Sequence, residues 1–170
     1  MNPHIEIITG ELEGTRYRDL ARGVLERLPQ GWDDNRTYSI EVPTEEPPMP
    51  GVCASAQRIE ELESETPDSE QCWIVKLYDQ KLSGLSDAAI KWIIAHELGH
   101  VKSGLPCGSI SIAGMGLTKV DAEPGQYRLI MPKEKDNHEV VADSIARDWG
   151  FTAEEKICLD EQDKKGDQKC

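Results

Sequence analysis

The order of hydrophobic and polar residues predicts one helix more clearly than any other element. Between Asp87 and Lys102, aliphatic residues recur every three or four positions, which is the repeat of a helix with one buried side. Ser86 precedes this segment as a candidate N-cap, and Gly104 and Pro106 follow it as stop signals. The apolar side of the predicted helix consists of Ile90, Ile93, Ile94, Leu98 and Val101.

Three further segments have a helical repeat. Asn137–Trp149 predicts a second long helix, which Gly150 ends. Tyr17–Leu28 predicts an earlier helix and Ala153–Leu159 a short later one.

Two segments alternate apolar and polar residues as strands do, namely Thr37–Val42 and Gln71–Tyr78. Between them, the proline-rich segment 43–50 and the acidic segment 60–70 predict loops. The strands and helices together predict an α+β fold.

Length and charge limit the classes of protein to consider. A chain of 170 residues suits one domain, which we place at residues 1–159, followed by a polar tail at 160–170 that we expect to be disordered. The 32 acidic and 19 basic residues give a net charge of −13, which repels nucleic-acid phosphates. The sequence contains no apolar stretch of the roughly 18–20 residues that span a membrane, and its first residues lack a secretory signal. We therefore expect a cytoplasmic protein that binds neither nucleic acid nor membranes.

The five cysteines form no C-x-x-C pair and are odd in number, so we expect thiols rather than a disulfide framework or a cysteine-based zinc site. If the protein were secreted, Cys53 and Cys72 would be the first pair to test. The cysteines are Cys53, Cys72, Cys107, Cys158 and Cys170.

The most informative segment is His96-Glu97-Leu98-Gly99-His100, inside the most clearly predicted helix. Residues four apart in a helix differ by only about 40° around the axis and about 6 Å along it, so both imidazoles can bind one ion. Zinc accepts imidazole nitrogens at about 2.0–2.1 Å, and Glu97 can then act as general base on a metal-activated water. The apolar stripe of the helix leaves the side with His96 and His100 for a cleft.

A catalytic zinc site needs a third protein ligand. Glu139 and Asp143 lie four residues apart on the second long helix, so one can bind the metal while the other accepts a hydrogen bond from a ligand imidazole. His138 is a rival ligand, but it points about 100° away from Glu139 on the helix. The full set of candidates is His4, Cys107, Asp121, Glu123, His138, Glu139 and Asp143.

The segment Glu139-Val140-Val141-Ala142-Asp143, downstream of the histidine motif, resembles the E-x-x-A-D element of gluzincin metallopeptidases. The resemblance covers about residues 86–150. It implies that Glu139 is the third zinc ligand and that Asp143 supports a zinc-binding histidine, His96. It further implies a zincin-like fold, in which a small mixed sheet packs on the metal-binding helix and a second helix carries the third ligand.

The same resemblance implies one zinc ion per chain and hydrolysis of a peptide or protein substrate. Zincin folds bind substrate as an extra strand along a sheet edge, for which Gln71–Tyr78 is the candidate. The chain departs from the membrane prenyl-peptidases in lacking a membrane span, and 38 residues separate His100 from Glu139, more than in thermolysin-like enzymes. The metzincin pattern does not fit, because Ser103 and Pro106 stand where its glycine and third histidine belong.

Two alternatives compete with a peptidase. In a metal-stabilised binding or regulatory module, proteolysis is absent or restricted to one partner, but such a site has no need of Glu97. In a scaffold without metal, the histidines are core groups and the carboxylates cap or solvate a helix. Gly99 argues against the scaffold, because an interior glycine costs about 1 kcal/mol of helix stability and often marks the close approach of another segment.

Overall fold

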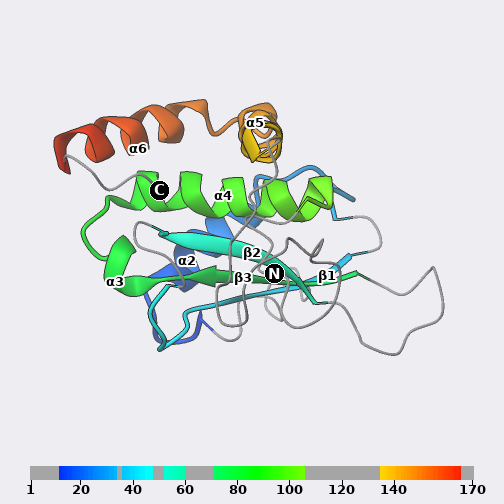
Figure 1. Cartoon of the computed structure of the whole chain (residues 1–170), viewed down its shortest axis with the longest axis horizontal. Coiled ribbons are helices and arrows are strands. Elements are labelled where there is room, and N and C mark those ends of the chain that lie inside the picture. Colours follow the sequence, from blue (N-terminus) through cyan, green and yellow to red (C-terminus); the bar gives the residue numbers. More distant parts are fainter. Residues whose placement is uncertain (1–11, 34–35, 48–51, 60–70, 106–134, 166–170) are drawn as a thin grey trace, which may run out of the picture.

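The computed structural model describes residues 12–33, 36–47, 52–59, 71–105 and 135–165. Within these residues a small three-stranded sheet and five helices form a mixed α+β fold (Figure 1), as the sequence predicted. In chain order the elements are α2 (Tyr17–Leu25), β1 (Arg36–Glu41), β2 (Ala54–Ile59), β3 (Gln71–Leu77), α3 (Asp79–Leu82), α4 (Asp87–Ser103), α5 (Lys135–Asp148) and α6 (Thr152–Lys165).

The capping signals of α4 are confirmed. The side chain of Ser86 accepts a hydrogen bond from the backbone N–H of Ala89 at 3.3 Å, which satisfies a donor that the first turn of a helix leaves without a partner. Gly104 ends the helix with a φ of 74°, a left-handed conformation that glycine adopts without steric cost. Local sequence signals therefore fix both ends of the helix that carries the histidine motif.

The sheet has the strand order β1-β3-β2, with β1 parallel and β2 antiparallel to β3. Because β3 is paired on both sides, it cannot offer an edge to a substrate, and our expectation for Gln71–Tyr78 is wrong. Among the strands that the structure describes, the edges belong to β1 and β2.

β2 lies between the two predicted loops, where the sequence pattern predicted no strand. Its buried positions carry only the small residues Ala54, Ser55 and Ala56, so the large apolar residues that mark a strand are missing. These two alanines lie opposite Leu77 and Val75 of β3 in the register of the sheet. Pairing with β3, rather than local propensity, therefore defines this strand.

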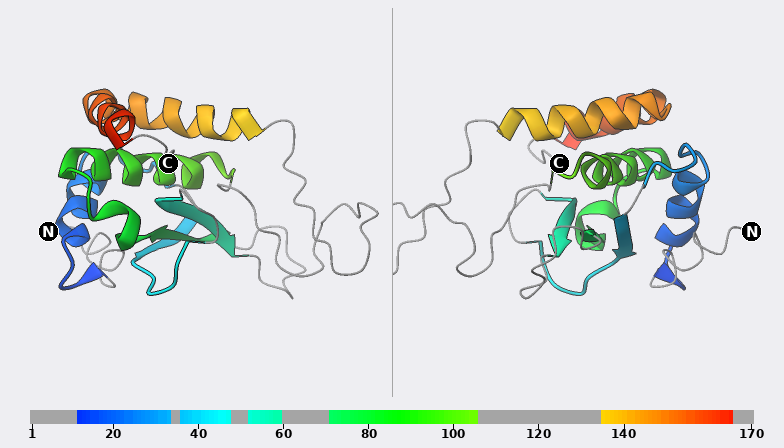
Figure 2. Two further views of the ribbon diagram at one scale, coloured as in Figure 1. Left: turned by 60° about the vertical axis from the view of Figure 1, so that its left-hand side comes forward. Right: turned by 90° about the vertical axis from the view of Figure 1, so that its right-hand side faces the viewer.

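Helix α4 occupies a middle layer, with the sheet on one side and α5 and α6 on the other (Figure 2). It is consequently buried on nearly all sides and not along a single stripe. Trp92, Glu97 and His100 are buried together with the aliphatic residues, at 7%, 4% and 0% exposure. We expected the side of this helix with His96 and His100 to be open as a cleft. That expectation is wrong, because α5 covers this side of α4.

Helix α6 continues six residues beyond the predicted end at Leu159. Phe151, just before it, and Cys158 within it are buried against the core, and the carboxylate of Glu161 accepts the backbone N–H of Ser86 at 3.0 Å. The predicted disordered tail is thus helical from residue 160 to Lys165, and residues 166–170 lie outside the described part of the chain.

Cys53 is disulfide-bonded, which corrects the expectation that the cysteines are all thiols. Cys72 and Cys158 are thiols, so the suggested Cys53–Cys72 pair is also wrong. The register explains this, because Cys72 lies opposite Ile59 at the far end of β2 from Cys53. Disulfides are typical of oxidising compartments, so this bond gives no support to the predicted cytoplasmic location. None of the described helices is long and apolar enough to cross a membrane.

Candidate metal centre

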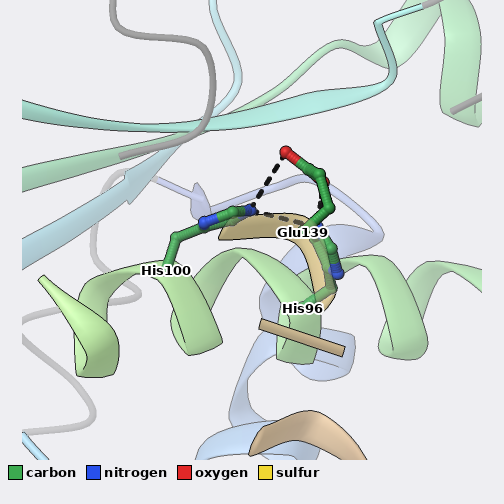
Figure 3. A group of neighbouring side chains, drawn as sticks. All are labelled: His96, His100 and Glu139. Carbon is green, nitrogen blue, oxygen red and sulfur yellow. Dashed lines mark hydrogen bonds and ion pairs between the residues drawn. The ribbon is translucent and has the colours of Figure 1, made fainter. Parts of the chain in front are cut away.

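Three side chains from two helices converge between α4 and α5 (Figure 3). Helix α4 places His96 and His100 one turn apart, with their Nε2 atoms 3.2 Å from each other. Helix α5 contributes Glu139, whose Oε2 lies 3.1 Å from Nε2 of His96 and whose Oε1 lies 3.7 Å from Nε2 of His100. These are the three residues that the sequence analysis predicted as metal ligands.

The second nitrogen of each imidazole already has a partner. Nδ1 of His96 lies 2.8 Å from Oδ1 of Asp143, and Nδ1 of His100 lies 2.8 Å from the backbone carbonyl oxygen of Leu105. A carbonyl only accepts, so Nδ1 of His100 carries the hydrogen, and an ionised Asp143 imposes the same tautomer on His96. In their neutral forms, both imidazoles therefore direct the lone pair of Nε2 into the space beside Glu139.

This geometry fits a metal ion. Ligand atoms placed tetrahedrally about 2.0–2.1 Å from zinc stand about 3.3–3.4 Å from one another. The two Nε2 atoms are 3.2 Å apart, close to that value, and one ligand atom from each of the three residues lies within 4.8 Å of the other two. If both imidazoles are neutral, two lone pairs and a carboxylate oxygen face each other at such distances, so the site favours a cation, either a metal ion or a proton on His96. The donor set, two imidazoles and one carboxylate, is also the set found in one class of catalytic zinc site.

The carboxylates beside His96 attract positive charge to this point. Burial of the ring lowers its pKa, but the hydrogen bonds to Asp143 and Glu139 outweigh burial and raise the pKa of His96 to about 10. Reciprocally, the imidazoles of His100 and His96 hold the pKa of Glu139 well below its usual value. A metal ion would meet this demand for positive charge by displacing the proton from His96.

Glu97 contacts β2 on the side that does not pair with β3. Tyr78 donates its N–H to the carbonyl of Cys53 at 3.0 Å. Because bonded and non-bonded pairs alternate in an antiparallel ladder, the backbone N–H and C=O groups of Ala54 and Ala56 point away from β3. The N–H of Ala56 donates to the carboxylate of Glu97.

The second carboxylate oxygen of Glu97, Oε2, has no hydrogen-bond partner among the residues that the structure describes. Burial raises the pKa of Glu97, while the nearby His96 and His100 oppose that effect. A buried carboxylate with one oxygen left over is costly unless a ligand or water satisfies it. This second observation, independent of the three converging ligands, also points to a missing partner at the site.

The turn after α4 orients His100. The side chain of Ser103 donates to the carbonyl of His100 at 3.0 Å and accepts the N–H of Leu105 at 3.2 Å. The left-handed Gly104 reverses the chain between them, which brings the carbonyl of Leu105 back to the imidazole. Arg36 of β1 donates to the carbonyl of Lys102 and ties this turn to the sheet.

The two helices approach each other closely at Gly99 and Ala142, between the ligands. Ala142 is fully buried, and its backbone lies where a side chain on Gly99 would be. The close approach that the sequence analysis associated with Gly99 is therefore confirmed. It brings Glu139 and Asp143 within reach of the histidines on α4.

The remaining predicted candidates fall into two groups. His138, although adjacent to Glu139, is not a member of the ligand group found among the described residues. Four others lie outside the described part of the chain: His4, Cys107, Asp121 and Glu123. The sequence did not predict the backbone partners that Leu105 and Ala56 supply. It carries no signal for them, because every residue has a backbone carbonyl and every residue except proline has a backbone N–H.

Comparisons with protein-family models, curated proteins and solved structures give no match to this chain.

Proposed function

We propose that this protein is a zinc-dependent peptidase of the gluzincin type. In this proposal His96, His100 and Glu139 hold one zinc ion, Asp143 orients His96, and Glu97 is the general base. The main support is the convergence of the two Nε2 atoms and the Glu139 carboxylate within 3.1–3.7 Å, with both Nδ1 atoms already engaged. Such an arrangement fixes the imidazole tautomer that binds a metal.

Zinc held by three protein ligands supplies a Lewis acid, which polarises a carbonyl and lowers the pKa of water to about 7. Glu97 supplies the proton acceptor. The N–H of Ala56 fixes one oxygen of its carboxylate, and Oε2 remains available to take a proton and deliver it to a leaving amine. A purely structural metal site does not require a buried general base.

The three ligand side chains differ in their exposure. The side chain of His100 is fully buried, whereas that of Glu139 is 40% exposed. Access at the third ligand is what a catalytic site requires, since a substrate must approach the metal at a position that the protein leaves open.

The edge of β2 beside Glu97 is our candidate for the strand that pairs with substrate. The outward N–H and C=O groups of Ala54 and the outward C=O of Ala56 point away from β3, and Glu97 lies at this edge. An extended peptide could add to the sheet here by main-chain hydrogen bonds. We propose β2 as the substrate edge in place of β3.

Replacing Glu97 by Gln tests the mechanism. The variant is expected to retain one zinc per chain, measured by elemental analysis, and to lose hydrolysis of an unfolded protein substrate such as casein by at least about 100-fold, the lower range for general base catalysis. Glu45→Gln, at a side chain that is 67% exposed, is the matched control and should keep full activity.

Hydrolysis by the Glu97→Gln variant at the wild-type rate would refute the role of Glu97. A wild-type protein that binds zinc tightly and cleaves no peptide would instead favour the metal-stabilised binding module.

A further inference from the structure

A chain of charged contacts runs from the metal centre through α5 to α6. Asp143 uses Oδ1 to contact Nδ1 of His96 at 2.8 Å, and its other oxygen, Oδ2, lies 3.6 Å from Nη2 of Arg147. Arg147, one turn further along α5, donates from Nε and Nη2 to the two oxygens of Glu155 at 2.8 and 2.5 Å.

The contact between Arg147 and Glu155 is a two-pronged one, in which the planar guanidinium fits both carboxylate oxygens. Such pairs fix the orientation of the arginine as well as its position. Glu155 is 14% exposed and lies in the first turn of α6, where the helix dipole favours a negative charge. The contact with Glu155 of α6 therefore fixes the guanidinium of Arg147, and Nη2 of this guanidinium lies near Asp143.

Helix α6 provides a fixed base for this contact. It packs against α4, Phe151 and Cys158 are buried in the core, and Glu161 accepts the backbone N–H of Ser86 at the N-terminus of α4. The left-handed Gly150 turns the chain from α5 into α6, and Arg27 of the segment after α2 donates to its carbonyl at 2.7 Å. A path of contacts thus starts on α4 at His96, passes through α5 and α6, and returns to α4.

We propose that Arg147 is a positioning residue of the metal centre, which holds Asp143 in the orientation that fixes His96. Asp143 is 31% exposed, so without a second partner its carboxylate can turn toward solvent and leave the imidazole. The ion pair with Arg147 engages Oδ2 of Asp143, so Oδ1 stays directed at His96. This inference rests on the metal site of the proposed function and extends it to α6.

The test is zinc affinity, measured on the full chain by competition with a chromophoric chelator. Arg147→Gln is expected to weaken zinc binding about tenfold, the low end of the effect of outer partners of metal ligands. It should also change the visible absorption of the Co²⁺-loaded protein, which reports ligand geometry. Glu155→Gln, which weakens the contact of Arg147 with α6, should shift affinity in the same direction and serves if Arg147→Gln does not fold.

A coupling measurement separates positioning from general stability. If Arg147 acts through Asp143, Arg147→Gln should have little effect on zinc affinity in an Asp143→Ala background. The matched control is Arg16→Gln, which removes a contact of Arg16 with Asp87 of α4 at 2.6 Å but touches neither Asp143 nor a ligand. Its zinc affinity should stay within about twofold of the wild type.

Unchanged zinc affinity in both Arg147→Gln and Glu155→Gln would overturn the inference. An equal loss in Arg16→Gln, or an undiminished effect of Arg147→Gln in the Asp143→Ala background, would also overturn it. These results would leave a zinc-binding, peptide-hydrolysing wild type intact. A wild type that binds no zinc would overturn the proposed function and the inference together.

Discussion

A Cβ atom on Gly99 would lie 2.7 Å from the backbone carbonyl oxygen of Ala142 and 3.0 Å from its Cα. Real side chains do not come so near to backbone atoms, so the spacing between α4 and α5 depends on this glycine. The ligands His96 and His100 flank Gly99 on α4, and Glu139 lies one turn before Ala142. Any displacement of α5 therefore changes the distance between the histidines and the third ligand.

Gly99→Ala is expected to destabilise the protein by about 1–3 kcal/mol through overpacking, although alanine favours a helix by about 1 kcal/mol over glycine. Zinc affinity should fall as well, because Glu139 moves with α5. The measurements are urea unfolding of the metal-free protein and chelator competition. Gly23→Ala, in α2, is the control: its nearest atom would be Cε of Lys91 at 3.9 Å, so it should be neutral or stabilising. Equal effects of the two substitutions would contradict the close-approach explanation.

Glu139→Ala is expected to abolish stoichiometric zinc retention after gel filtration, because it leaves two protein ligands. His138→Ala changes the preceding residue of the same helix, lies outside the ligand group, and should retain about one zinc per chain. Elemental analysis measures the zinc content of the two variants and identifies the third ligand. The reverse ranking would make His138 the third ligand.

Trp92 reports occupancy of the site. Its ring centroid lies 6.3 Å from that of His96, one turn away on α4. Co²⁺ bound by His96 should therefore quench tryptophan fluorescence, and excess zinc should reverse the quenching. The chain has four tryptophans, so Trp92→Phe should remove most of the change while leaving most of the emission. Quenching that persists in this variant would place the bound metal elsewhere.

The ion pair of Arg27 with Glu154 predicts a pH dependence of stability. Burial raises the pKa of Glu154, but the hydrogen bond from Arg27, a backbone hydrogen bond and the positive charges of Arg27 and Lys91 together outweigh burial and lower that pKa. A carboxyl group whose pKa is lower in the folded state stabilises the protein above its unfolded pKa of about 4.3 and loses this contribution as the pH falls through the folded pKa.

Glu154→Gln should therefore destabilise the protein at neutral pH by about 0.5–1 kcal/mol, the range of a partly exposed pair, and the difference from wild type should shrink below about pH 4. Urea unfolding at pH 7 and pH 3.5 measures it. Glu13→Gln, at a side chain that is 77% exposed, is the control and should show no comparable pH-dependent difference. A gap that widens in acid would contradict the assignment.

The sequence by itself determined the local elements and the core of the metal site. The ends of α4 follow from Ser86 and Gly104, and the positions of His96 and His100 follow from helix geometry alone, because residues four apart share a face. Glu139 and Asp143 needed the added resemblance to a family motif, since nothing local says which carboxylate will face another helix. The structure brings both to the histidines.

Only the tertiary structure decided the rest. β2 carries alanines where a strand pattern would carry large apolar residues, so its pairing with β3, which puts β3 in the centre of the sheet, is a long-range effect. The groups that hold His100 and Glu97, the carbonyl of Leu105 and the N–H of Ala56, are backbone atoms. A backbone group acquires a specific role only when folding places it, and a sequence of side chains does not encode that placement locally.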